Sequence, residues 1–262
     1  MTEIAQDEAP GTRTGRVAAV VDAARTQAER AAERFPATPD LKLAMASSGA
    51  VLSGYTVVHM LGNLQVYLGR RRFDSYAHGL RTLGAPILPP RALLWAFRAV
   101  LAADAVTHLS CAAVLTVRAQ QAARRPAARP RPRPRGRRRT PWQTLRRSMR
   151  STGTVLGLFT AFHVADLTLG ARPAAARHVP GAAYDNLVAS LRRPPAAALY
   201  LAAMLALAAH TSQGLVQIGN DTGLSAERST RERFELAGRI LGTGVALGNA
   251  SIPVAVTLRL VR

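Results

Sequence analysis

Residues Leu43–Leu68 read LAMASSGAVLSGYTVVHMLGNLQVYL, a run long and apolar enough to cross a membrane as one helix. Four more stretches share this character, at about Ala92–Val117, Thr152–Gly170, Pro195–Ile218 and Leu236–Leu258. Since a span needs about 20 mainly apolar residues, the sequence predicts an all-α protein, an integral membrane bundle of five transmembrane helices. Pro253 is expected to kink the last helix.

The charge of the chain is segregated from these apolar stretches. The formal net charge is +20, and residues 118–150 contain 13 arginines and no acidic residue. We expect a cytoplasmic N-terminal tail at 1–40 with a short amphipathic helix over 16–34, and a membrane domain at 41–258. An Arg/Pro-rich linker at 118–150 interrupts that domain, and its most biased part, 124–139, is expected to be disordered.

Arginine beside a membrane span favours the cytoplasmic side. The linker joins the second and third spans, so five spans leave the N-terminus cytoplasmic and the C-terminus external. We expect a multi-pass protein of the bacterial cytoplasmic (inner) membrane, with anionic lipid and no nucleic acid as the partner of the arginines.

Few other residues carry a signal. The lone Cys111 excludes an intrachain disulfide and an all-cysteine cluster, and it is expected to pack as a small apolar side chain. Gly242-Thr243-Gly244 is interpreted as helix packing, because no strand precedes it. Gly153 and Gly157 are expected to admit a neighbouring helix or the edge of a porphyrin. We expect no internal repeat.

Four histidines, one in each of the first four spans, carry the functional signal: His59, His108, His163 and His210. A histidine inside a bilayer is costly unless it meets a partner, a cavity or a cofactor. At a helix rise of about 1.5 Å per residue, His59 and His163 fall at an outer level, and His108 and His210 fall at an inner level. Two opposed imidazole pairs match the requirement of two six-coordinate haems.

Several segments carry a family resemblance. They are Ser48-Gly49, HMLGNL at 59–64, FDSYAHGLRTLG at 73–84, FHVADLT at 162–168, YDNLVAS at 184–190 and SIPVAV at 251–256. In their combination the chain resembles the di-haem cytochrome b membrane-anchor subunit of succinate dehydrogenase and fumarate reductase, in its five-helix single-anchor form. The likeness covers roughly residues 41–258.

The resemblance implies two b haems, one held by His59 and His163 and the other by His108 and His210. It also implies a flavoprotein and an iron–sulfur subunit docked on the cytoplasmic face. Electrons from succinate would then pass through the inner and the outer haem to a membrane quinone, menaquinone being expected. The chain alone is not expected to oxidise succinate, since it has no flavin or cluster motif.

Other polar residues receive narrower predictions. Arg98 is a candidate partner for a haem propionate, or it reaches outward to the headgroups. Tyr76, His78 and Arg81, in the first external loop, are candidate quinone-site groups. Asp166 either orients a ligand and supports proton movement at the outer quinone, or caps a helix end facing the headgroups. Asp104 is expected to pair with Arg98 rather than with a ligand imidazole.

The sequence departs from the family pattern at two places. Ala85 stands where members often carry Glu, which removes a natural proton carrier for quinone chemistry. In the fourth span the pattern His-x-x-His-Gly is replaced by His210-Thr211-Ser212-Gln213-Gly214, so His210 alone is left as a ligand, and Gln213 is expected to form a hydrogen bond nearby.

Three alternatives stay open at this point. The same subunit can serve a fumarate reductase running in the reverse direction. A haem-free transporter would use the histidines to relay protons. A basic membrane adaptor would depend on the arginine run and would not need the histidines.

Overall fold

The computed structural model describes residues 13–124, 148–175 and 177–262. Within these ranges the chain forms helices and no strand, and five helices are long and apolar enough to cross a membrane. They are α2 (Thr38–Asn63, continued by the 3-10 helix η1, Leu64–Leu68), α4 (Ala92–Arg124), α6 (Met149–His163, continued by the π-helix η2, Val164–Leu169), α8 (Pro194–Asp221) and α9 (Arg228–Thr257). The predicted all-α architecture with five spanning helices is confirmed.

The helices extend beyond the predicted apolar spans at their polar ends. α2 begins at Thr38, so the expected boundary between tail and membrane domain falls inside this helix. α4 continues past Val117 to Arg124, which places the first part of the expected linker in the helix. α9 begins at Arg228, where the ion pair between Arg228 and Glu232, one turn apart at 2.9 Å, supports a polar first turn. The last linker residues, 148–150, lead into α6, which begins at Met149, while 125–147, with most of the arginine run that was expected to be disordered, lie outside the described residues.

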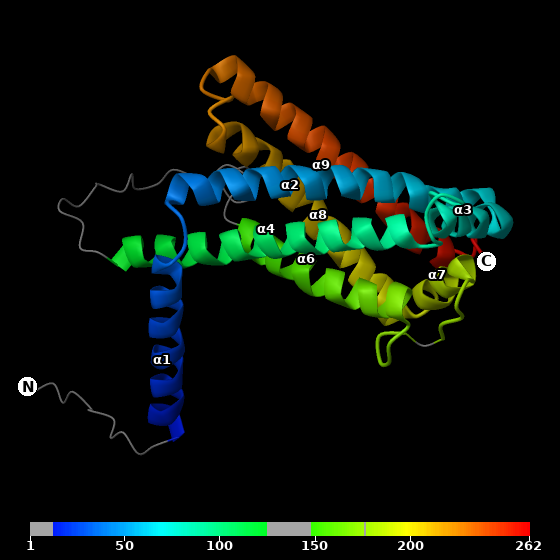
Figure 1. Ribbon diagram of the computed structural model, residues 1–262, viewed down its shortest axis with the longest axis horizontal. Coiled ribbons are helices and arrows are strands. Elements are labelled where there is room, and N and C mark those ends of the chain that lie inside the picture. The colour runs from blue at the N-terminus through cyan, green and yellow to red at the C-terminus, as the bar shows by residue number, and fades with distance from the viewer. Residues whose placement is uncertain (1–12, 125–147, 176) are drawn as a thin grey trace, which may run out of the picture.

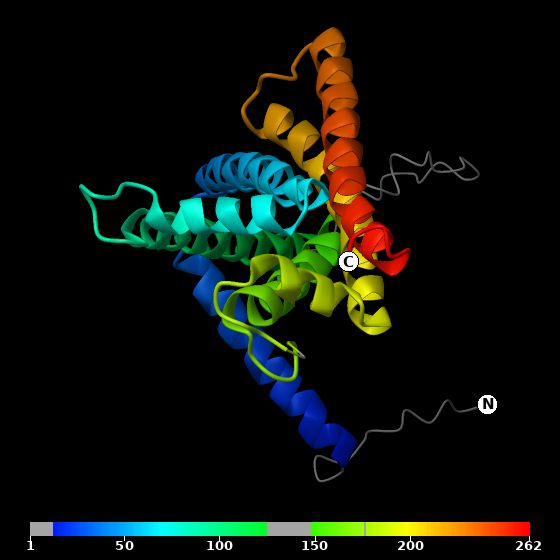
Figure 2. The ribbon, with the colours of Figure 1, turned by 90° about the vertical axis from the view of Figure 1, so that its right-hand side faces the viewer.

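Figure 1 shows how the spans are arranged. α2, α4 and α6 run along the long axis of the molecule, and α8 and α9 cross them obliquely as an antiparallel pair. Close backbone contacts join α2 to α4, α2 to α8, α6 to α8 and α8 to α9. Two short helices, α3 (Arg70–Thr82) and α7 (Ala183–Leu191), lie at the end where the chain terminates, and Figure 2 looks onto this end.

Small residues explain the close packing of α8 on α9. A Cβ added at Gly242 would meet Ser212 and the carbonyl oxygen of Ala208, and one at Gly238 would meet the backbone of Ser212. Gly242 therefore packs helix against helix, as predicted. Nearly half of the apolar segment of α8 is buried, whereas α6 is covered only in part by the other helices.

The first helix, α1 (Arg13–Glu33), stands across the end of the bundle where α2 begins (Figure 1). Arg118 of α4 holds this corner, because its guanidinium donates to the carbonyl oxygens of Ala32, Phe35 and Pro36 at 2.9–3.0 Å. Ala32 also packs with Cys111, which is buried as predicted.

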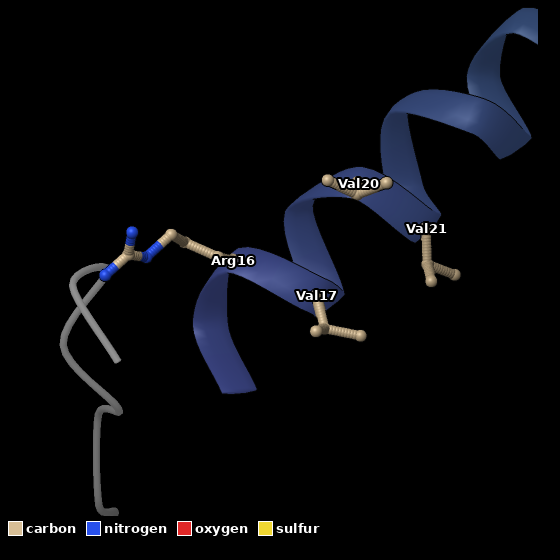
Figure 3. A pocket seen from close by; sticks show the side chains of 4 residues that line it. All are labelled: Arg16, Val17, Val20 and Val21. Atoms are coloured by element: carbon tan, nitrogen blue, oxygen red, sulfur yellow. The ribbon is translucent and has the colours of Figure 1, made fainter. Parts of the chain in front are cut away.

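The far part of α1 presents an exposed apolar stripe rather than a closed cleft. Figure 3 shows Val17, Val20 and Val21 beside Arg16, all from this one helix. Each of the three valines is at least 60% exposed. These valines are therefore largely uncovered, whereas the end of α1 near Ala32 packs against α4.

Candidate functional site

The bundle brings the four intramembrane histidines together as two pairs. The ring centres of His59 and His163 are 5.8 Å apart with an interplanar angle of 87°, and those of His108 and His210 are 6.3 Å apart at 70°. The first pair joins α2 to α6 and the second joins α4 to α8. Neither of these helix pairs is among those in close backbone contact, so the side chains meet across the interior of the bundle.

The donor set suits haem iron better than a metal ion held by protein alone. Among the described residues no group of three or more His, Cys, Asp or Glu side chains is placed to hold a metal ion. Two imidazoles leave a tetrahedral site incomplete, whereas a porphyrin supplies the four remaining ligands of a six-coordinate iron. Because metal–imidazole bonds are about 2 Å long, two rings on opposite sides of one iron have centres roughly 6 Å apart. Both pairs lie close to this spacing.

The hydrogen bonds of the four rings all fall on Nδ1, and each partner is a hydroxyl. His108 Nδ1 lies 3.1 Å from Ser48 Oγ, and His210 Nδ1 lies 3.2 Å from Thr152 Oγ1. His163 Nδ1 lies 3.1 Å from the Tyr200 hydroxyl, while His59 Nδ1 lies 3.5 Å from that of Tyr55. Of these four partners, Ser48 belongs to a segment quoted for the family resemblance, but the sequence analysis assigned a role to none of them: Ser48, Tyr55, Thr152 and Tyr200.

The hydroxyl partners indicate which nitrogen carries the proton. Ser48 donates its single proton to the carbonyl oxygen of Met45 at 3.1 Å, and Thr152 donates its proton to that of Ser148 at 2.8 Å. Each hydroxyl oxygen is then left to accept from Nδ1–H of the histidine. The Nε2 lone pair is free in this tautomer, which is the form that binds a metal.

Two glycines lie against the inner pair. A Cβ added at Gly49 would be 3.2 Å from Cε1 of His108, and one added at Gly153 would be 3.2 Å from Cε1 of His210. The backbone of the opposite helix thus approaches each ring as closely as a side chain would. Both Gly153 and Gly157 were expected to admit a neighbour. A neighbouring side chain lies close to Gly153, whereas nothing lies within 4 Å of a Cβ added at Gly157.

These glycines belong to a repeat that the sequence analysis missed. Ser48-Gly49 is followed by His59, and Thr152-Gly153 is followed by His163, with the same interval of ten residues from glycine to histidine. The two levels are therefore about 15 Å apart along both α2 and α6. A search for Ser/Thr-Gly at a fixed distance before each intramembrane histidine would have found the hydroxyl partners.

Asp166 is buried beneath the outer pair and does not face the headgroups. Its side chain is 2% exposed and forms an ion pair with Arg193 at 2.9 Å. It also accepts hydrogen bonds from Ser190 Oγ and, at 3.4 Å, from the Tyr200 hydroxyl. The interpretation of Asp166 as an interfacial cap is therefore wrong, because the π-helical turn of η2 directs it inward.

Two polar predictions on α4 and α8 are also wrong. Asp104 forms no ion pair with Arg98; its Oδ2 is buried without a hydrogen-bond partner, and the Arg98 guanidinium stacks over Trp95 at 5.0 Å. Gln213 was expected to form a hydrogen bond, but it is buried with Nε2 unpartnered.

The predicted quinone residues do not form one cluster. Tyr76, His78 and Arg81 all lie on α3, where the Tyr76 ring packs against Gly62 near His59 and His78 is exposed. Asp166 is bound instead by residues of α7 and of the turn before α8. Tyr55 lies beside His59, with their ring centres 5.4 Å apart, and Arg98 and Tyr76 interact electrostatically with Tyr55.

No protein-family model, no curated protein and no solved structure matches the chain. The family resemblance therefore depends on the residues quoted above and on the geometry of the four histidines.

Proposed function

We propose that this protein is the cytochrome b membrane anchor of a succinate dehydrogenase, carrying electrons from an iron–sulfur subunit through two b haems to a membrane quinone. One observation carries the proposal. Two opposed imidazole pairs at two heights, about 15 Å apart, have every Nδ1 engaged by a hydroxyl. A haem bound between each pair supplies a one-electron carrier.

The residues of the chain would prepare the two sites in three ways. The imidazoles of His59 and His163, and those of His108 and His210, would hold one haem iron each. The hydroxyls of Ser48 and Thr152 fix the tautomer and the ring orientation of the inner pair. Gly49 and Gly153 leave room for the rings of His108 and His210, which an added Cβ would approach to 3.2 Å.

The outer end offers a place for the quinone. Tyr55 lies beside His59 and the Tyr76 ring packs against Gly62, while Arg98 interacts electrostatically with Tyr55; phenol and guanidinium groups are donors suited to quinone oxygens. Arg98 would serve either this site or a haem propionate. The flavoprotein and iron–sulfur subunits would bind at the opposite end, where α1 lies, which we assign to the cytoplasmic side of a bacterial inner membrane.

A haem assay on single variants tests the proposal. The full-length protein, purified from membranes in detergent, is analysed by pyridine haemochrome for haem per chain. Two haems are expected in the wild type, and about one in His108→Ala or His163→Ala. His78→Ala is the matched control, since this exposed histidine lies outside both pairs, and it is expected to retain both haems.

Two results would overturn the proposal. A folded wild-type protein without reduced b-type absorption bands would favour the transporter that relays protons. Full haem retention in His108→Ala would remove the inner pair as a ligand set. The direction of catalysis, succinate oxidation or fumarate reduction, is then tested in the assembled complex with quinones of low and high potential.

A further inference from the structure

The four histidines differ in what lies behind their hydroxyl partners. Ser48 and Thr152 pass their protons to the neutral carbonyl oxygens of Met45 and Ser148. Tyr55, beside His59, is 43% exposed and has no recorded hydrogen bond to a carboxylate. Among these four hydroxyls, that of Tyr200 alone is hydrogen-bonded both to a histidine, His163, and to a buried carboxylate, that of Asp166.

The direction of the hydrogen bonds follows from this arrangement. The Asp166 carboxylate is held by Arg193 and accepts hydrogen bonds, so the Tyr200 hydroxyl donates its proton to Oδ2. The oxygen of Tyr200 then accepts from Nδ1–H of His163, at 3.1 Å. A chain of two hydrogen bonds thus runs from the ligand ring to a buried carboxylate.

The carboxylate is fixed in place from three elements. Arg193 Nη2 donates to Oδ1 at 2.9 Å, and Arg193 Nη1 also donates to the carbonyl oxygen of Ala174 at 2.7 Å. Ser190 of α7 donates to Oδ2. Asp166 is therefore held in one orientation toward Tyr200, inside a region where water is scarce and hydrogen bonds polarise one another.

We propose that Tyr200 and Asp166 are positioning residues that lower the reduction potential of the outer haem relative to the inner one; this inference rests on the proposed function. The carboxylate polarises the Tyr200 hydroxyl, and the tyrosine oxygen in turn draws the Nδ1 proton of His163. The ligand nitrogen becomes more basic and stabilises the oxidised iron. The hydroxyls of the inner pair end on neutral carbonyl oxygens. The acid near that pair, Asp104, lies one turn before His108 on α4 and acts on its ring through space, without a hydrogen bond that reaches Nδ1.

The experiment is a redox titration of the purified di-haem protein followed by visible spectroscopy, with electron paramagnetic resonance of the oxidised haems as a second readout. His163→Ala and His108→Ala first assign the two potentials to the outer and inner haem. Tyr200→Phe and Asp166→Asn are expected to raise the outer potential only. The expected change is about tenfold in the distribution of electrons between the haems, which corresponds to about 59 mV for one electron.

Two control variants separate this effect from a general disturbance. Tyr55→Phe removes the same phenol from the other ligand of the outer haem, where no carboxylate lies behind it, and is expected to shift the potential less than Tyr200→Phe. Asp104→Asn removes another intramembrane acid, which has no recorded hydrogen bond to a ligand, and is expected to leave the outer potential unchanged. Asp166→Glu is expected to restore part of the shift.

The outcomes distinguish this inference from the proposed function. Two bound haems with an unchanged outer potential in both Tyr200→Phe and Asp166→Asn would overturn the role of these residues and leave the function intact. Equal shifts of both haems would overturn it as well, because the effect would then be general. If Asp166→Asn fails to fold, Tyr200→Phe decides alone, since it removes one hydroxyl and keeps the ring. A wild-type protein without haem would overturn the function itself.

Discussion

If the two histidine pairs bind haem as proposed, an added side chain at Gly153 or Gly49 should remove the haem of the inner pair and spare that of the outer pair. In either variant the new Cβ would lie 3.2 Å from Cε1 of the ligand ring, inside the 3.4–4 Å of ordinary contact. Alanine thus requires the ring to shift by a few tenths of an ångström, and valine adds two methyl groups to the same space. Overpacking of this kind costs about 1–3 kcal/mol, a factor of roughly 5–150 in haem affinity.

Two matched controls lie on the same helices. Gly54 of α2 and Gly157 of α6 have nothing within 4 Å of an added Cβ. Alanine at these positions should leave both haems bound, and it favours the helix by roughly 0.5–1 kcal/mol. The assay is haem per chain together with a titration of the stripped protein with haemin. The reasoning fails if Gly153→Val and Gly49→Val keep two haems, or if the controls lose as much haem as the test variants.

Three further perturbations probe the frame that holds the sites. Arg118→Ala should free α1 from the bundle, because three carbonyl oxygens lose their hydrogen-bond donor. Limited proteolysis should then cut faster near residues 34–37, while the haem content stays unchanged. Gly242→Val should push α8 and α9 apart, since the added atoms meet the backbone at Ala208 and Ser212. The resulting loss of about 1–3 kcal/mol in stability should appear as a lower midpoint of thermal unfolding in detergent. Arg193→Ala should leave the Asp166 carboxylate buried without its counter-ion, which lowers the free energy of unfolding by about 3–5 kcal/mol. Arg193→Lys should recover part of this stability. Equal stability of the alanine variant and the wild type would show that this ion pair does not hold α7 and α8 together.

Much of the architecture could be predicted from the sequence because a bilayer restricts the choices. Long apolar runs must form helices there, and the helix rise converts sequence position into depth. The depths of His59 and His163, and of His108 and His210, are the basis of the pairs that the structure brings side by side. Helix ends were predicted less well, since ion pairs and prolines extend them past the apolar run.

The surroundings of the histidines could not be predicted because they depend on rotation about the helix axes. Depth places Asp104 near Arg98 along α4, but only the structure shows that the side chains diverge. Tyr200 lies thirty-seven residues from His163, and no local pattern joins them. Ser48 and Thr152 could have been found from the sequence. Each directly precedes a glycine that lies ten residues before a histidine, and this repeat can be recognised in the sequence alone.

Because the interval from glycine to histidine is the same in α2 and α6, each of these helices fixes the distance and the rotation between the two histidine levels. Each helix presents a hydroxyl and a glycine at one level and a ligand at the other, so neither end can turn without the other. One extra residue between Gly49 and His59 would rotate the two ends against each other by about 100° and lengthen the segment by about 1.5 Å. We expect this segment to tolerate exchange of its lipid-facing side chains freely, while a single insertion or deletion within it would disable both levels at once.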